Sequence, residues 1–469
     1  MEMLTPTLTS DSHIPIYQQL YHYMKEEIKT GHIPYNCKLP SKRKLSTHLG
    51  ISQNTIQAAY DQLIEEGYIH SLEKKGFYVN KLDHLQTLKV NSVSEERIVE
   101  ELTPNIQYDF SYHGVDFSTF PFDTWRRLSK EVINEYDKEL LQLGDSSGYY
   151  RLRSVIATYL HQSRGVNCTM EQVIISSGTE MLFQSLIQLF NQNYIYGIEN
   201  PGYERLNQLF RGNRAAFTSI LIDDSGMIPE EVDKNKPNVL CITPAHQFPS
   251  GQIMPINRRI RLLNWANQDQ NRYIIEDDYD SEFKYSGKPI PALQGIDENE
   301  KVIYMGSLSK SISPTLRVSY MVLPLHLLKR YRMELSYQLC PVPIFEQKVL
   351  TRFIEDGYFE RHLNKMRNIY KRKRELLVVS LQNINRKIKI LGADAGLHLL
   401  IQVPNDMSEE QLLITAAHVG IRIYKCSSYY SNQTDLPVIP TILLGYAMIS
   451  EQDIEVSCKR LQHAWYPNQ

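Results

Sequence analysis

The chain has 469 residues, enough for roughly two to four domains, and its hydrophobic fraction of 42% and charged fraction of 22% are close to the globular average. These values exclude a chain that is mainly disordered, collagen-like or of low complexity. The formal net charge is −2, so a basic field over the whole protein is absent and any DNA binding must come from a local patch.

The cysteines and the apolar segments indicate in which cellular compartment the protein is expected. The six cysteines are scattered and form no Cys-x-x-Cys pair, which argues against a zinc ribbon or a secreted disulfide scaffold. Residues 1–15 lack the pattern of a signal peptide, and no apolar run approaches the ~18 residues of a membrane helix. We expect a cytoplasmic protein without a metal site or a membrane partner.

Three zones differ in pattern along the chain. Residues 13–80 hold short helical patterns, residues 81–107 are polar and irregular, and residues 108–469 alternate strand-like apolar runs with helical patterns. We therefore expect a small N-terminal domain, a linker and a large α/β domain.

The first zone has the pattern of a helix-turn-helix followed by a two-stranded wing. Apolar residues recur at intervals of three and four between positions 17 and 28, which predicts a helix. Ser41 and Ser52 are good N-caps for two further short helices. Residues 68–70 and 76–79 then predict two strands joined by a tight turn.

Charge and polarity within this zone suit a DNA interface. Residues 14–80 hold eight Lys or Arg and six Asp or Glu, a local balance of +2. On charge alone an ordinary solvated surface is the more frequent explanation. Phosphate contacts are predicted from the first helix of the motif and the wing tip, at Lys42, Arg43, Lys74 and Lys75. Base-edge contacts are predicted from the start of the second helix, at Ser52, Gln53, Asn54, Thr55 and Gln57.

The whole segment resembles the GntR superfamily of winged-helix regulators. The stretches that carry the resemblance are residues 39–45, 49–56, 63–69 and 76–79. Gln53 is a departure, since many members carry arginine there. The resemblance implies binding to a double-stranded DNA operator.

In the large zone, three predicted strands end in residues that are typical of ligand-binding or catalytic sites. Residues 173–175 predict a strand that leads through Gly178 and Thr179 into a helix, a common phosphate cradle that is weak evidence alone. Residues 273–275 predict a buried strand followed by acids, either a ligand site or an ordinary acidic loop. Residues 302–305 predict a third strand, whose end carries hydroxyls and a lysine that is either a Schiff-base former or a surface residue.

Together these strand ends match the needs of pyridoxal phosphate. This cofactor requires a lysine amine, a carboxylate for its ring nitrogen, a donor near its phenolic oxygen and a cationic, hydroxyl-rich phosphate cup. Tyr203 adds an aromatic ring that would cover or flank the cofactor. The candidates for the amine, the carboxylate, the phenolic contact and the cup are Lys310, Asp277, Tyr279 and the set Gly178, Thr179, Ser307 and Arg317.

Most of residues 108–469 resembles the fold-type-I aminotransferase superfamily. With the winged helix in front, the chain is similar to the MocR subfamily of GntR regulators, through residues 243–251, 275–283 and 306–310. The resemblance implies an α/β fold with pyridoxal phosphate held as a Schiff base. It makes Lys310 the Schiff-base lysine, pairs Asp277 with the ring nitrogen, and assigns Tyr279, Tyr203 and Arg205 to the phenolic oxygen, the ring and an effector.

Departures from the aminotransferase pattern bear on which small molecule the protein is expected to respond to. Glu180 stands where glutamine is frequent, and Phe248 where asparagine is common, so Gln247 is a candidate for the missing ring contact. The positions expected to grip a substrate carboxylate, Leu443 and the loop 424–430, carry no arginine. This favours the cofactor itself as the signal, whereas similarity to the GABA-responsive branch favours an amino acid.

The predicted function is transcription regulation by a protein that binds pyridoxal phosphate and responds to it or to an amino acid, with control of pyridoxal phosphate synthesis as one expectation. A working aminotransferase and a GABA-responsive regulator are the alternatives, and we expect the large domain to sense rather than to catalyse. The resemblance implies a head-to-tail homodimer. A flexible segment as long as 81–107 spans on the order of 30 Å, enough to cross to a partner.

Overall fold

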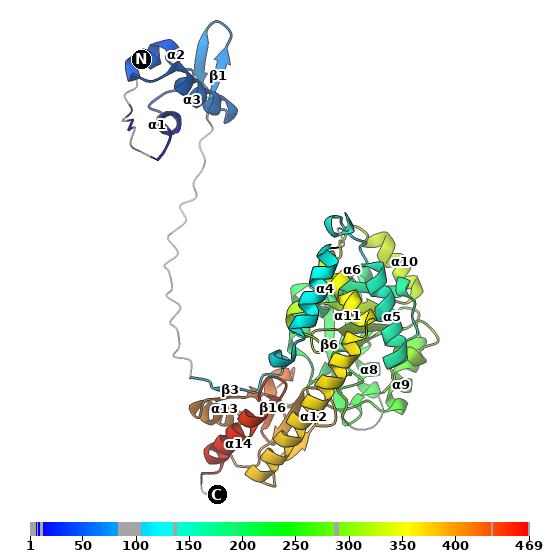
Figure 1. Cartoon of the computed structure of the whole chain (residues 1–469). Coiled ribbons are helices and arrows are strands. Elements are labelled where there is room, and N and C mark those ends of the chain that lie inside the picture. The colour runs from blue at the N-terminus through cyan, green and yellow to red at the C-terminus, as the bar shows by residue number, and fades with distance from the viewer. Residues whose placement is uncertain are drawn as a thin grey trace. The chain divides into compact units, whose positions relative to one another are not determined.

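The computed structural model describes residues 6, 8–9, 13–82, 105–134, 138–191, 193–285, 290–432 and 435–467. The chain divides into two compact units, Met1–Val99 and Glu100–Gln469 (Figure 1). Most of the expected linker 81–107 lies outside the described residues. The domain limits given above stay predictions, and each unit is described by itself.

The small unit is a three-helix domain with a hairpin. Its helices and strands are α1 Ile16–Lys29, α2 Lys42–Leu49, α3 Gln53–Glu65, β1 Ile69–Leu72 and β2 Gly76–Val79. The strands are antiparallel, with Ile69 opposite Val79. Both predicted N-caps are confirmed, because the Ser41 side chain accepts a hydrogen bond from the amide of Lys44 and Ser52 accepts one from Thr55.

The small unit has its own core. Leu20 and Met24 of α1, Leu45 of α2, and Ile56 and Leu63 of α3 are all 0% exposed. The apolar stripe predicted for the first helix is therefore confirmed as its buried face. This packing holds α3 against the two other helices while its N-terminal residues stay in solvent.

The large unit is built on an eight-stranded sheet with the order β4-β11-β10-β9-β8-β5-β6-β7. β5, β6, β8, β9 and β10 are parallel, and β4 runs the same way because β11 is antiparallel to both β10 and β4. The strands are β4 Val173–Ser176, β5 Ile195–Asn200, β6 Ala216–Asp223, β7 Gly226–Met227, β8 Val239–Ile242, β9 Tyr273–Asp278, β10 Val302–Ser307 and β11 Ser319–Val322.

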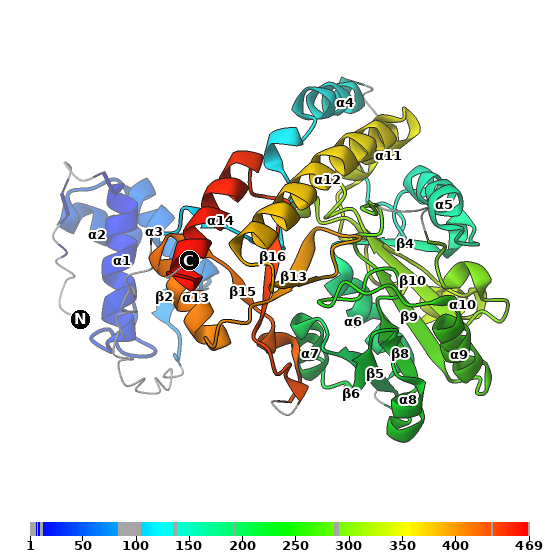
Figure 2. The same cartoon turned by 90° about the horizontal axis from the view of Figure 1, so that it is seen from below.

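Helices cover both faces of this sheet (Figure 2). Ile275 and Met305 pack with α6, α7 and α10, whereas Ile274 and Leu240 pack with α8 and α9. Neighbouring residues of a strand thus enter opposite layers, as strand geometry requires. The helices before, around and after the sheet are α4 Phe122–Asn134, α5 Tyr150–Arg164, α6 Thr179–Phe190, α7 Glu204–Gly212, α8 Pro229–Asn235, α9 Ile256–Asn267, α10 Leu325–Glu334 and α11 Ile344–Glu355.

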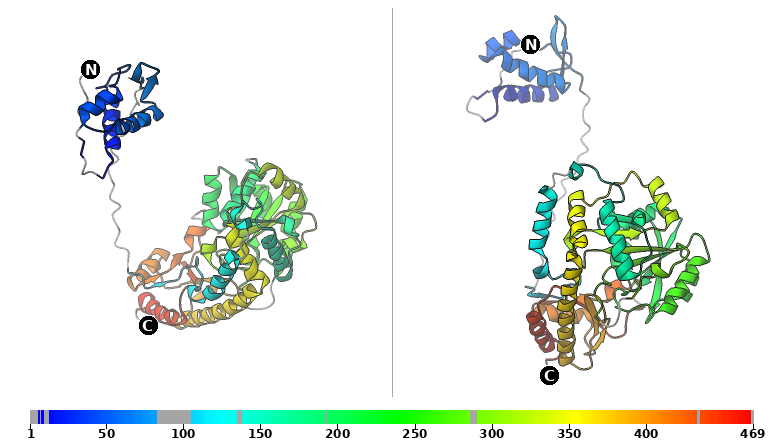
Figure 3. Two further views of the ribbon diagram at one scale, coloured as in Figure 1. Left: turned by 45° about the horizontal axis from the view of Figure 1, so that its top comes forward. Right: turned by 45° about the vertical axis from the view of Figure 1, so that its right-hand side comes forward.

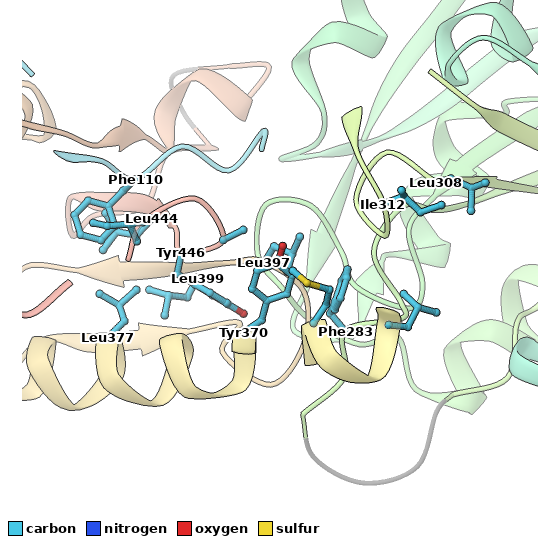
Figure 4. Packing of buried hydrophobic residues seen from close by; sticks show 14 of the residues in the cluster. Phe110, Phe283, Leu308, Ile312, Tyr370, Leu377, Leu397, Leu399, Leu444 and Tyr446 are labelled. Carbon is cyan, nitrogen blue, oxygen red and sulfur yellow. The ribbon is translucent and has the colours of Figure 1, made fainter. Parts of the chain in front are cut away.

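The C-terminal part of the large unit is coloured orange and red in Figure 3. It contains a second, smaller sheet with the order β12-β13-β16-β15. Tyr370 and Leu377 of the long helix α12 point toward Leu399 of β13 (Figure 4). Among the described residues, no helix combines the length and apolar character needed to cross a bilayer. The elements of this part are α12 Tyr358–Ile384, β12 Lys389–Leu391, β13 His398–Gln402, α13 Glu409–His418, β14 Ile421–Arg422, β15 Tyr424–Lys425, β16 Thr441–Gly445 and α14 Glu451–Trp465, with β14 paired to β3 Tyr108–Asp109.

Candidate functional site: a cavity at the carboxyl edge of the large sheet

One cavity collects all the predicted cofactor and effector residues. It lies where β4, β9 and β10 end, the edge at which open α/β sheets bind ligands. The sequence-predicted residues that line it are Gly178, Thr179, Tyr203, Arg205, Asp277, Tyr279, Ser307, Lys310 and Arg317.

Strand alternation selects one carboxylate from the acidic run at the end of β9. Asp277 lines the cavity. Its neighbours Glu276 and Asp278 are buried on the opposite face of the strand. The Asp278 carboxylate accepts hydrogen bonds from Arg164 at 2.8 Å and from Tyr304 at 2.6 Å, which makes it a structural residue.

Asp277 is poised for a cationic partner. Its Oδ1 atom is buried and has no hydrogen-bond partner among the described residues. Burial, together with the nearby carboxylates of Asp278 and Glu199, raises the pKa of Asp277 to about 7. A buried carboxylate gains strongly from a protonated ring nitrogen, so this orphaned atom fits the pyridine ring of pyridoxal phosphate.

Lys310 follows β10 in the loop that borders the cavity. Its Nζ donates a hydrogen bond to the backbone oxygen of Tyr112. Burial lowers the pKa of Lys310 to about 8, against an opposing effect of the Asp280 carboxylate. A larger fraction of this amine is neutral near pH 7 than for an ordinary lysine, and the neutral amine is the form that attacks an aldehyde.

The hydroxyls and the guanidinium expected for a phosphate cup lie together. The Ser307 hydroxyl donates to the Ser309 hydroxyl at 2.9 Å and accepts from the Ser319 hydroxyl at 3.1 Å. Gly178 has φ +87°, and an ideal Cβ there would lie 2.1 Å from Nη2 of Arg317. Only glycine therefore allows the guanidinium to approach the start of α6, whose free backbone amides favour an anion.

Tyr279 is oriented by a buried histidine that sequence reasoning did not select. The Tyr279 hydroxyl lies 3.0 Å from Nδ1 of His246, and this nitrogen lies 3.0 Å from Oδ2 of Asp280. Ligand atoms of His246, Asp280 and His398 lie within 4.8 Å of one another. His246 and Asp280 bond each other, and His398 Nε2 lies 3.1 Å from the backbone oxygen of Pro249, so the polar network itself accounts for their grouping.

An aromatic wall closes the effector side of the cavity. The Phe248 ring packs edge-on against Tyr203 at 5.7 Å and against Tyr429 at 5.0 Å between ring centroids. Arg205, in the first turn of α7, is solvent-exposed and also lines the cavity. Burial, with added effects of Lys310 and Arg205, lowers the pKa of His113 to about 4, so this side chain is neutral at pH 7.

Gln247, considered above as a ring contact, is absent from the residues that line the cavity. Its amide donates to the backbone oxygens of Pro201 at 2.9 Å and Phe248 at 2.6 Å. Sequence reasoning missed several residues that line the cavity or directly contact its lining. His246 and Asp280 lie inside the motifs quoted above, which offered a signal, whereas nothing in the local pattern marks the others. These missed neighbours of the site are Tyr112, His113, His246, Asp280 and His398.

The predicted DNA-contacting residues differ in availability. Lys42 donates to the side chain of Gln57, which in turn donates to Asp61, and Thr55 is half-buried beside the Ser52 cap. Their side chains would have to exchange these partners for DNA. The predicted residues that the small unit exposes to solvent are Arg43, Ser52, Gln53, Asn54, Lys74 and Lys75.

Two family models match the chain. The model described as bacterial regulatory proteins of the gntR family covers residues 16–79, and that for aminotransferase class I and II covers residues 114–461. The crystal structure of Pyrococcus horikoshii kynurenine aminotransferase, in complex with PMP, superposes with a TM-score of 0.69 at 25% identity over 78% of this chain and 92% of that one.

Relatives match most of the length of this chain. An uncharacterized HTH-type transcriptional regulator of Bacillus subtilis, YdeL, is 42% identical over 98% of this chain and 99% of its own. The probable rhizopine catabolism regulatory protein MocR of Rhizobium meliloti is 30% identical over 98% and 95%. The HTH-type pyridoxine biosynthesis transcriptional regulator PdxR of Corynebacterium glutamicum is 28% identical over 88% of each chain.

Proposed function

Because this chain belongs to the MocR subfamily of gntR-family transcription regulators, we propose that it binds pyridoxal phosphate at Lys310 and that the state of this site controls DNA binding by the winged helix. One observation carries the proposal. A lysine of lowered pKa and a carboxylate with an orphaned buried oxygen line the same cavity, at the edge of the sheet where ligands bind.

Several residues of the cavity have distinct roles in this proposal. When bound, pyridoxal phosphate supplies an aldehyde that joins a lysine amine and an electron-withdrawing ring. Asp277 holds the proton at the ring nitrogen, and Lys310 offers its neutral amine. Tyr279, held by His246, faces the phenolic oxygen. Arg317 and the amides at the start of α6 hold the phosphate.

For the small unit we propose that the start of α3 enters the major groove. Asn54 and Gln53 are exposed there and reach base edges, while Arg43 on α2 and Lys75 at the wing tip neutralise phosphates. A single winged helix reads one half-site, so the proposed active form is a homodimer, arranged head-to-tail as the subfamily resemblance implies. Its target is cytoplasmic DNA.

The signal we propose is the cofactor itself. Leu443 is 0% exposed within the aromatic cluster around Phe248, and Lys425 does not line the cavity, so neither grips a carboxylate there. Arg205 and Arg317 are the two guanidinium groups among the described lining residues, and Arg317 is assigned to phosphate. The likeness to a regulator named for pyridoxine biosynthesis adds support. An amino acid bound at Arg205 is the alternative signal.

A working aminotransferase is the second candidate, favoured by the likeness to an aminotransferase structure. Absorbance and borohydride trapping at Lys310 test cofactor binding. Product assays with amino donors and keto acids, beside DNA-binding titrations with and without cofactor, then separate the two functions. Turnover without any change in DNA affinity would favour the enzyme, and a cofactor-dependent change in affinity without turnover would favour the sensor.

A further inference from the structure

The proposed phosphate cup already contains an anion, the carboxylate of Glu180. Glu180 is the second residue of α6, and its Oε2 lies 2.8 Å from Nη2 of Arg317. Both residues line the cavity. An ideal Cβ on Gly178 would lie 2.1 Å from Nη2 of Arg317 and 2.5 Å from Oε2 of Glu180, so the ion pair rests directly against the Gly178 backbone.

The Glu180 carboxylate interacts with the same two features that would hold a phosphate, the N-terminus of α6 and the Arg317 guanidinium. Glu180 is the acid in the first turn of a 12-residue helix, where the helix dipole favours negative charge. Its partner Arg317 is the guanidinium assigned to the phosphate. A phosphate monoester carries nearly two negative charges at pH 7, so it is repelled by Glu180 as long as this carboxylate stays in place.

The ion pair of Arg317 and Glu180 can open easily, so that Arg317 can exchange Glu180 for a phosphate. The side chains of Arg317 and Glu180 are 49% and 36% exposed, so water can solvate either one when the contact opens. By contrast, the buried pair of Arg164 and Asp278 is 5% and 2% exposed, and its partners have no such escape. The residue at position 180 therefore changes how strongly Arg317 is available to an incoming phosphate.

We propose that Glu180 is an affinity- and specificity-determining residue that competes with the cofactor phosphate for Arg317. The inference rests on the proposed function and concerns the regulation of the same site. Phosphate binding transfers Arg317 from Glu180 to the phosphate and releases the carboxylate to solvent. Cofactor affinity is thereby weakened at the phosphate end alone, which suits a sensor that must release its ligand when the ligand becomes scarce.

The test compares Glu180→Gln with the wild-type chain, both stripped of cofactor and checked for unchanged circular dichroism. Titration with pyridoxal phosphate, followed by absorbance, should show about twofold to fivefold tighter binding for the variant, the range of a half-exposed ion pair. Titration with pyridoxal, which lacks the phosphate, should show no difference. Glu204→Gln is the matched control, because Glu204 opens α7, accepts a hydrogen bond from the side-chain amide of Gln208 and does not line the cavity.

The outcomes are distinct. Equal or weaker binding of pyridoxal phosphate by Glu180→Gln would overturn the inference, since it would mean that Glu180 is neutral or holds Arg317 ready for the phosphate. A tighter complex with pyridoxal as well would also overturn it, because the phosphate would then not be involved. If the wild-type chain binds no pyridoxal phosphate at all, the proposed function fails instead.

Discussion

Replacing the Asp277 carboxyl group tests the electrostatics of the cofactor site without any ligand, through the pH dependence of protein stability. The pKa of Asp277 is raised from 3.8 to about 7, so between these values the folded protein binds a proton that the unfolded chain has lost. Stability of the cofactor-free protein therefore falls as pH rises from about 4 to about 7. At about 1.4 kcal/mol per pKa unit, and with a discount for the open cavity, Asp277 contributes about 2–4 kcal/mol to this fall.

Asp277→Asn removes this contribution. Urea unfolding of the cofactor-free full-length chain at pH 5 and pH 7.5, with the transition of the large unit followed separately, should show a smaller loss of stability for the variant. Glu199 serves as a comparison, because burial also raises its pKa to about 7, and Glu199→Gln should remove a similar share. Equal pH dependence in wild type and Asp277→Asn would refute the reasoning.

Lys310→Ala should abolish the borohydride-trappable link to cofactor while circular dichroism stays unchanged, and a trapped adduct in the variant would contradict the assignment. Arg43→Ala and Lys75→Ala should weaken DNA binding to a similar degree on all sequences and reduce its salt dependence by about one unit of slope each, measured by fluorescence anisotropy at several salt concentrations. Asn54→Ala should instead change which base is preferred in a selection from random DNA. Arg205→Ala should leave the response to pyridoxal phosphate alone nearly unchanged, and a lost response would point to an effector at that arginine.

Much of the site could be predicted because the residue pattern of each strand, and the chemically active residues at its end, can be recognised from a short stretch of sequence. Residues 273–275 predict a buried strand with acids at its C-terminal end, and β9 includes these acids as far as Asp278, because Glu276 and Asp278 find hydrogen-bond partners inside the fold. Glu276 accepts hydrogen bonds from the backbone amides of Leu293 and Gln294. The alternation of faces then leaves Asp277 for the cavity, a consequence that period-two geometry implies once the strand is extended.

Other parts of the site depend on tertiary contacts that no local pattern shows. Tyr112 and His113 line the cavity and follow the two-residue strand β3, which pairs with β14, more than 300 residues later in the chain. The contact between Glu180 and Arg317 joins residues 137 positions apart. Sequence reasoning identified each residue of this pair as notable, but only the fold shows that they meet.

Side-chain hydrogen bonds within the small unit also change which of the predicted DNA-contacting residues we expect to matter most. Residue type and helix position selected Lys42 and Gln57, yet these two side chains bond to each other. Arg43 and Asn54 are exposed and need no such exchange. We therefore expect the latter two to dominate the measured effects on DNA affinity and base preference.

The central claim is that the cofactor site controls DNA binding, and one measurement tests it most directly. Genomic fragments captured by the purified full-length protein are sequenced with and without pyridoxal phosphate, for the wild type and Lys310→Ala. The account predicts that the cofactor changes the amount or the identity of the captured fragments for the wild type, without any amino acid, and leaves the Lys310→Ala profile unchanged. Identical profiles for the wild type with and without cofactor would contradict it.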